Sequence, residues 1–344
     1  MEKKELRLSR ILRFAIIFFI VIGILLAFTN LRELKRHLFS LRILPFIAGG
    51  ACALLTYVCE GFFLFFSLRL FKERLGLVEA FRYSFIINGV GYLVSFGGLT
   101  PFATQVHVLD YAGVSPGKAT LSRALHVVIF NIFFNILLIY GYTSVLVNKK
   151  AHELQVSLIT VIVMFFVFLL ILFYVAIFCE RIRVAGLRGI ARFFTIIVRP
   201  FGLKRDLKPD DAINFFREFQ EGCKSLIQNP LLFLILLGVA LADWIFMLGI
   251  MHFSFLSLTY NIRAGFLIIG FTIGQIIVVV SMVPGGAGTM EGSMAMTYRA
   301  LGTPLEISLA AVLIFRTLFY ILPFFLCLPF YFTMRSKLRN RWKF

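Results

Sequence analysis

The chain has 344 residues, of which 60% are hydrophobic and only 15% are charged. Soluble domains contain about 45–50% apolar and about 25% charged residues, so one soluble core could not bury this many apolar side chains. The composition therefore excludes a soluble protein and predicts a single integral membrane domain over residues 1–344.

The charge is unbalanced, with 35 Lys and Arg against 17 Asp and Glu and a formal net charge of +18. In a soluble protein this excess would suggest nucleic acid as a partner. In a membrane protein, basic residues gather in cytoplasmic loops and contact anionic lipid headgroups. We therefore predict membrane lipids as partners, above all anionic phospholipid, and no nucleic acid. A homo-oligomer is left open. The five cysteines show no metal or disulfide spacing, so we predict no metal and no cofactor.

The apolar runs are continuous rather than alternating, which indicates membrane-spanning helices and not a β-barrel. Basic residues precede the first run, 14–28, which we interpret as a transmembrane helix because no signal-peptide cleavage site follows it. Five more full spans are predicted over 43–67, 121–147, 156–179, 231–253 and 305–332.

Two further apolar stretches, 83–117 and 264–300, are interrupted by glycine, proline and polar residues. Irregular backbone at membrane depth is tolerated only where protein buries it or where it lines a wet cavity. We predict that both stretches are re-entrant helical hairpins. The predicted fold class is thus an all-α polytopic membrane protein with about six full spans and two broken hairpins.

The distribution of basic residues predicts the topology. With both termini in the cytoplasm, 24 Lys and Arg residues fall inside and 7 fall outside, as the positive-inside rule requires. The two hairpins then enter from opposite faces, which predicts an inverted repeat with halves of about 1–150 and 151–344 around a midplane site. The basic connector 180–229 is typical of amphipathic helices on the cytoplasmic face of the cell (inner) membrane.

The second interrupted stretch contains the sequence PGGAGTMEG from Pro284 to Gly292. Its proline stops a helix, and Gly285, Gly286 and Gly288 let backbone approach a ligand closely. We expect Thr289 to cap the next half-helix, whose N–H groups favour an anion, and Glu291 to lie in its first turn. The alternative is a solvent-exposed loop between two full helices.

Two arginines are candidate anion ligands. Arg316 lies near the middle of the span 305–332, where an arginine almost always has a partner, and its guanidinium suits phosphate. The alternative is an ion pair with Glu291, Asp243 or Glu60. Arg123 begins the equivalent helix of the first half, where snorkelling to the interface is the alternative, and Gln105 lines the first hairpin.

Asp243 and Glu60 are acidic residues inside predicted spans. Each is expected either to be a proton or cation site or to neutralise Arg316. No P-loop, HExxH or GxSxG motif is present, so we do not expect an enzyme. Two alternatives stay open: an enzyme that modifies a lipid or polyprenyl phosphate with Glu291 or Asp243 as base, and an ion-coupled carrier of a small anion.

At these residues the chain resembles the flippase-like transmembrane family attached to lysylphosphatidylglycerol synthases. Residues 284–292 resemble its PGG-x-G-x-x-E-G motif, residues 310–316 its A-x-x-L-x-x-R helix, and residues 97–101 with Gln105 its glycine–proline motif. The resemblance implies a unit that moves anionic phospholipids or related amphiphiles between leaflets. It covers the membrane region only, without the family's aminoacyl-transferase domain.

Overall fold

The computed structural model describes residues 36, 39–93, 99–147, 160–161, 164, 228–281 and 283–341. These residues form helices and connecting turns, with no strand among them. The helices are α3 (Ile43–Leu70), α4 (Leu77–Leu93), α5 (Leu99–Tyr111), α6 (Pro116–Val147), α10 (Pro230–Ser257), α11 (Ala264–Ser281), α12 (Thr289–Ala300), α13 (Leu305–Arg316) and α14 (Leu322–Arg341). A 3₁₀ turn, Pro284–Gly286, precedes α12, and a π-helical turn, Thr317–Ile321, joins α13 to α14.

Within the described residues, five helical segments are long and apolar enough to cross a membrane. Four of them, α3, α6, α10 and the continuous α13–α14 segment, correspond to spans predicted from the sequence. The fifth is α11, whose 18 residues were assigned to the second hairpin. The predicted spans 14–28 and 156–179 and the connector 180–229 lie outside the described residues, apart from a few isolated positions.

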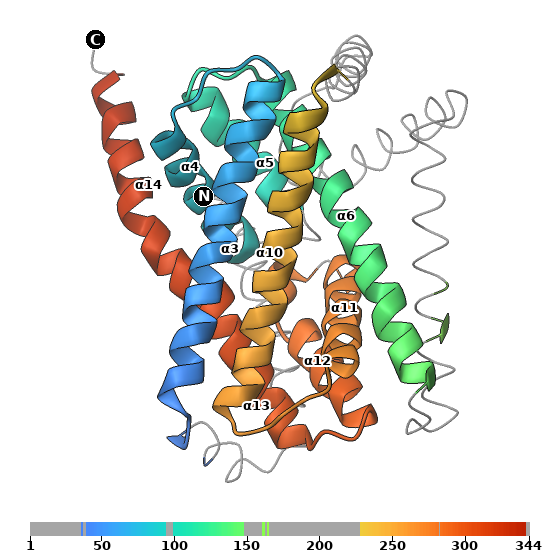
Figure 1. Cartoon of the computed structure of the whole chain (residues 1–344). Helices are drawn as coiled ribbons and strands as arrows, with labels where there is room; N and C mark the ends of the chain where they lie inside the picture. The colour runs from blue at the N-terminus through green and yellow to red at the C-terminus, as the bar shows by residue number, and fades with distance from the viewer. Residues whose placement is uncertain are drawn as a thin grey trace, which may run out of the picture.

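The two halves repeat the same order of helices in opposite directions (Figure 1). Helices α3 and α10 each have 28 residues, run antiparallel and pack side by side. Each is followed by a hairpin, with arms of 17 and 13 residues in α4–α5 and 18 and 12 residues in α11–α12. The hairpins start from opposite ends of the molecule, as expected of an inverted repeat. Their re-entry into a bilayer stays a prediction.

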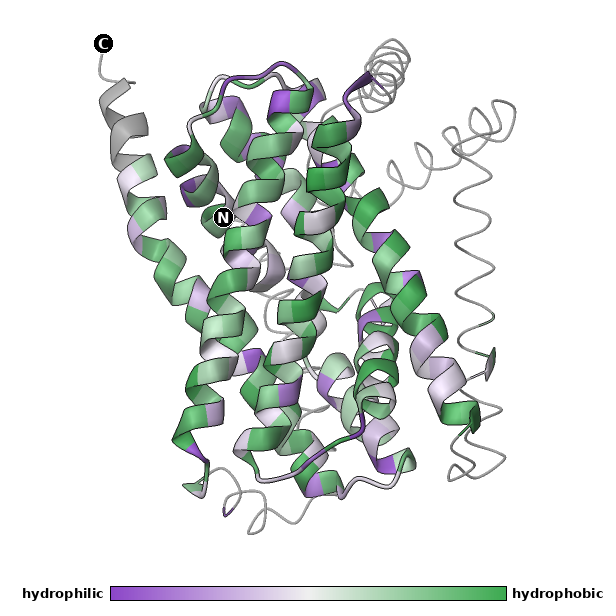
Figure 2. Ribbon diagram, viewed as in Figure 1, coloured by the Kyte–Doolittle hydropathy of each residue, from purple (hydrophilic) through white to green (hydrophobic). Residues whose placement is uncertain are grey.

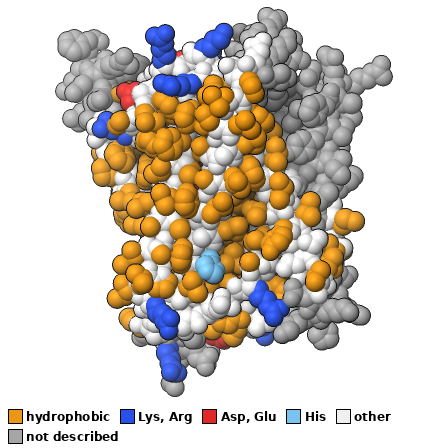
Figure 3. Space-filling model, in the orientation of Figure 1, with side chains coloured by type: hydrophobic (Ala, Val, Ile, Leu, Met, Phe, Trp, Pro, Cys, Tyr) orange, Lys and Arg blue, Asp and Glu red, His pale blue; other side chains and the backbone are white. Residues whose placement is uncertain are grey.

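The outer surface suits a lipid environment. Apolar residues run along the helices, whereas hydrophilic residues gather at the connecting loops (Figure 2). On the face seen in Figure 3, hydrophobic side chains cover the middle, and Lys and Arg lie at the two ends. Large apolar residues of α3 and α10 are exposed, including Leu54, Leu55, Leu241 and Ile245.

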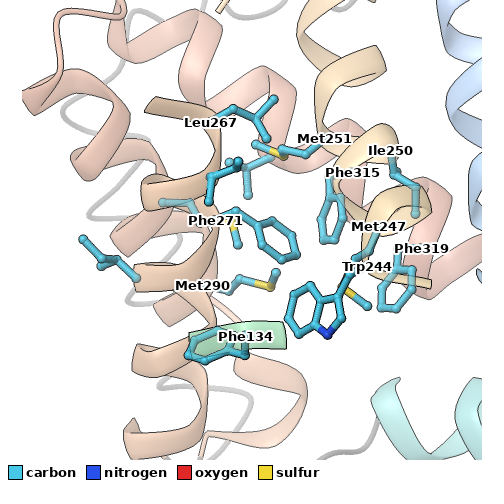
Figure 4. Close-up of a cluster of buried hydrophobic side chains, with 14 of the residues drawn as sticks. Phe134, Trp244, Met247, Ile250, Met251, Leu267, Phe271, Met290, Phe315 and Phe319 are labelled. Carbon is cyan, nitrogen blue, oxygen red and sulfur yellow. The ribbon is translucent and has the colours of Figure 1, made fainter. Parts of the chain in front are cut away.

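The interior is packed with aromatic and sulfur-containing side chains from both halves (Figure 4). Phe134 of α6 and Phe271 of α11 lie against Trp244 of α10, with ring centroids 5.8 and 6.3 Å away. The Trp244 indole N–H donates to the Phe130 carbonyl at 3.2 Å. Glycines allow close helix contact: a Cβ built on Gly270 would lie 2.2 Å from the ring of a buried tyrosine on α12.

Candidate functional site

The candidate site residues do not form one site but two clusters, one in each half. Gly285, Gly288, Glu291 and Arg316 contact one another at the tip of the α11–α12 hairpin. Glu60, Arg123 and Gln105 instead line a cavity between α3, α4, α5 and α6. We describe these as the second-half cluster and the first-half cavity.

The loop before α12 needs glycine at three positions. Gly285, Gly286 and Gly288 have φ values of +61°, +61° and +79°, in the left-handed region that other residues rarely adopt. At Gly286 a Cβ would also lie 2.7 Å from a methyl group of Val278. This tight turn holds the Gly285 carbonyl and the Gly288 N–H beside the start of α12.

The cap of α12 differs from the expectation. The N-cap is Gly288 rather than Thr289, because the Glu291 carboxylate, three residues on, accepts the Gly288 N–H at 2.8 Å. The Thr289 hydroxyl donates to the Gly286 carbonyl at 3.2 Å and lies 3.1 Å from the Ser281 hydroxyl. The positive end of the half-helix therefore faces a carboxylate of the protein itself.

Arg316 is held by this loop. Its guanidinium donates to the Glu291 carboxylate and to the Gly285 carbonyl, and its Cζ lies 5.0 Å from the centroid of the Tyr320 ring. The side chains of Arg316 and Glu291 are 14% and 6% exposed. Of the three acidic partners considered from the sequence, the structure selects Glu291. Three of the five guanidinium N–H groups have no acceptor among the described residues.

A π-helical turn directly follows Arg316 and was not predicted. It spans Thr317–Ile321, and the Tyr57 hydroxyl of α3 donates to the Phe319 carbonyl inside it at 3.1 Å. The turn places Tyr320 beside the Arg316 guanidinium. Single π turns within α-helices are often found at functional sites, but no residue type in the sequence signals one.

Glu60 is the acidic centre of the first-half cavity. Its carboxylate accepts the Tyr92 hydroxyl at 3.0 Å and lies 3.0 Å from His126 Nε2. The His126 ring stacks on Phe130 with centroids 3.9 Å apart and contacts the edge of Phe63. Glu60 therefore does not neutralise Arg316, and its partners are a histidine and a tyrosine that the sequence alone did not connect to it.

Arg123 lies in the same cavity and is only 6% exposed. The snorkelling interpretation is wrong because α6 begins at Pro116, which places Arg123 inside the helix and against the hairpin. Its Nη1 donates to the Asn88 side-chain carbonyl at 3.5 Å. Gln105 of α5 donates to the Ala119 carbonyl at 3.2 Å and also contacts Ser122 of α6. The empty space bounded by these residues is about 230 Å³, which includes space open to the outside.

Asp243 of α10 is completely buried, and neither carboxylate oxygen has a hydrogen-bond partner among the described residues. It lies close enough to Glu60 for the two carboxyl groups to interact electrostatically across the α3–α10 contact. It does not pair with Arg316. The interpretation of Asp243 as a proton or cation site stays a prediction.

Comparison with known proteins identifies the family of the chain. No curated protein matches the chain closely. The family model described as the lysylphosphatidylglycerol synthase TM region matches residues 10–327, which include both clusters. This match covers nearly all of the chain, and five helices in the part that the structure describes are suited to cross a membrane. The chain is therefore a multi-pass membrane protein that belongs to the lysylphosphatidylglycerol synthase TM region family.

Proposed function

We propose that this protein moves an anionic phospholipid, or a related amphiphile, between the two leaflets of the cell membrane. The headgroup would be held inside the protein at the second-half cluster, and the acyl chains would stay in the bilayer. The observation that carries the proposal is Arg316, an almost buried arginine on an apolar helix, whose guanidinium has three N–H donors without an acceptor among the described residues.

Each part of the cluster has a role in this mechanism. Glu291 and the Gly285 carbonyl orient the guanidinium, so that its remaining N–H groups can contact two oxygens of a phosphate. The first N–H groups of α12 have no acceptor within the helix and add donors at the same place. Arg316 supplies the positive charge that attracts the phosphate, and the N–H groups at the start of α12 orient it.

The two hairpins provide a means of alternation. They start from opposite ends of the molecule, and the first contacts the second half through Tyr92, whose ring centroid lies 5.5 Å from Phe319 and 6.4 Å from Tyr320. Tyr320 in turn lies beside Arg316. We propose that alternating movement of the hairpins opens the headgroup site to one leaflet and then to the other.

Leaflet exchange tests this proposal directly. The purified protein is reconstituted in liposomes containing fluorescent phosphatidylglycerol or phosphatidylcholine, and reduction by an impermeant reagent reports the outer-leaflet fraction over time. We expect faster exchange of the anionic lipid, and its loss in Arg316→Ala. Arg299→Ala is the matched control, because Arg299 is an exposed arginine on α12. No exchange of either lipid at equal protein insertion would refute the proposal.

The proposal assigns no chemical step to the chain. Mass spectrometry of the lipids recovered from the same liposomes tests this point, because a lipid-modifying enzyme would change lipid mass when a water-soluble co-substrate is supplied. Any protein-dependent mass change would favour the enzymatic alternative with Glu291 or Asp243 as base.

Asp243 favours a second candidate, an ion-coupled carrier of a small anion. A buried carboxyl group without a hydrogen-bond partner among the described residues is a natural place to bind and release a proton. This function predicts uptake of a soluble anion that follows an imposed pH gradient and needs no lipid tail. Uptake that is lost in Asp243→Asn, without leaflet exchange in the wild type, would support it.

A further inference from the structure

The buried arginines of the two halves differ in the side chains that contact them. In the second half, the returning arm of the hairpin, α12, brings a carboxylate to Arg316. In the first half, the hairpin brings only neutral side chains towards Arg123, namely Asn88 from α4 and Gln105 from α5. Arg123 is nevertheless the more buried of the two arginines.

Arg123 lacks a full counter-charge within the described part of the chain. Its one hydrogen bond among the described residues, to the Asn88 side-chain carbonyl, is long at 3.5 Å, and no carboxylate of these residues lies within 4.0 Å of its nitrogens. The Nε and Nη2 atoms make no hydrogen bond with the described residues, and the side chain lines the cavity. The unused donors of a buried cation therefore face the cavity.

Glu60 does not fill this role. Its carboxylate is already engaged by Tyr92 and His126, both at 3.0 Å, and it acts on Arg123 only at longer range. Burying a charge without a directly bonded partner is unfavourable, so an anion that enters the cavity would gain the full attraction of the guanidinium.

We propose that the first-half cavity binds a phosphate-type oxyanion, distinct from any ligand of Arg316. Arg123 would hold two of its oxygens, and the hydroxyl and amide groups of Ser84, Ser122 and Asn88 line the remainder. The anion would be a single phosphate group, from free phosphate or from a lipid phosphodiester, and this site does not depend on lipid transport.

Thermal unfolding of the full-length protein in neutral detergent tests the site, because a ligand bound only by the folded state raises the melting temperature saturably. The probes are inorganic phosphate and dihexanoyl phosphatidylglycerol, with dioctanoylglycerol as an uncharged lipid control and ionic strength held constant with gluconate. We expect at least one anion to raise the melting temperature saturably in the wild type, and the uncharged lipid not to do so.

The decisive variant is Asn88→Asp, which keeps the side-chain shape but places a carboxylate beside Arg123. We expect it to fold and to weaken the apparent affinity for the anion at least tenfold, because the new carboxylate competes with it. Arg123→Gln should have the same effect on affinity. Arg299→Gln, on the exposed surface of α12, should bind as the wild type does.

The outcomes distinguish free phosphate from a lipid phosphodiester as the ligand, and they distinguish this proposal from the lipid-transport proposal. Saturable binding of inorganic phosphate shows that the free anion suffices, whereas a response to phosphatidylglycerol alone assigns the site to a lipid phosphodiester. Equal responses in wild type and Asn88→Asp, or no saturable response to either anion, would overturn the inference. Loss of leaflet exchange in Arg316→Ala has no bearing on this result, and anion binding without any exchange would refute only the transport proposal.

Discussion

Removing either partner of the Arg316–Glu291 pair is expected to destabilise the protein more than replacing both. In Arg316→Met a buried carboxylate, 6% exposed, keeps only the Gly288 N–H, and in Glu291→Gln a buried guanidinium loses its counter-charge. Uncompensated buried charges of this kind cost about 3–5 kcal/mol. Arg316→Met also loses the contact with the Tyr320 ring, which contributes about 1–2 kcal/mol where it is desolvated. The double variant leaves no charge at the pair. Its free energy of unfolding should therefore be about 2–3 kcal/mol higher than the sum of the two single effects would give.

The free energy of unfolding is measured by titrating sodium dodecyl sulfate into mixed micelles and following the helical circular dichroism signal. Arg299→Met and Glu306→Gln form the control cycle, since these residues lie on the neighbouring helices α12 and α13 and make no salt bridge within the described ranges. Each control is expected to change stability by less than about 0.5 kcal/mol. Additivity of the Arg316→Met and Glu291→Gln effects within about 0.5 kcal/mol would refute the reasoning.

The same double variant separates structure from ligand binding. If Arg316 contacts the headgroup phosphate, the double variant regains stability but not lipid exchange, because no cation remains to bind the phosphate. Recovery of both stability and exchange would show that the pair is only structural. In that case the phosphate contact proposed for Arg316 is wrong.

Three further substitutions probe the packing around the clusters, each by the same unfolding titration. Gly286→Ala should lower the free energy of unfolding by roughly 1–3 kcal/mol, since its φ is +61° and the new Cβ would lie 2.7 Å from a methyl group of Val278. An unchanged unfolding midpoint would contradict this. Gly270→Ala should cost about 1–3 kcal/mol by separating α11 from α12, because the Cβ would lie 2.2 Å from the Tyr298 ring. Asp243→Leu should raise the free energy of unfolding by about 1–3 kcal/mol, because it removes two buried oxygens without partners among the described residues. A loss of stability would show that the carboxylate has a hydrogen-bond partner when the protein is in the membrane.

Much of the fold follows from local hydropathy. A membrane-spanning helix must be apolar along its own length, so four of the five candidate spans could be predicted from continuous runs. The second hairpin was placed at 264–300, and the observed arms begin at Ala264 and end at Ala300. The prolines and glycines that mark it act on the backbone of the same segment, which makes them readable without tertiary information.

The first hairpin was less well predicted for a physical reason. Its first arm begins at Leu77, six residues before the expected start at 83, so the charged residues Glu79 and Arg82 lie within the helix. These charges lie in the first two turns of α4, near the end of the molecule where α3 ends and α4 begins. There they can remain at the aqueous boundary while the helix continues. Charge marks the edge of a membrane more reliably than it marks the end of a helix.

The partners of the buried charges could not be predicted, because they depend on packing between segments far apart in sequence. Glu60, Asp243 and Glu291 were equivalent candidates to neutralise Arg316 when only their depth in a span was known. The α12 arm brings Glu291 to Arg316, whereas α6 brings His126 to Glu60. Only the three-dimensional arrangement of the two halves distinguishes these choices.

The contrast between the two arginines connects the fold to function. Each lies on the helix that follows a hairpin, and its side-chain partner comes from that hairpin, from α4 for Arg123 and from α12 for Arg316. Arm α12 supplies a carboxylate, which fixes the Arg316 guanidinium and leaves it able to use its spare donors on a phosphate. Arm α5 supplies the amide of Gln105, which cannot neutralise Arg123, and the Glu60 carboxylate of the same cavity is bonded to Tyr92 and His126 instead. The repeat thus gives one arginine a directly bonded carboxylate from its own hairpin and the other only an amide, so the two proposed anion sites can be tested separately by substitution at Arg316 and at Asn88.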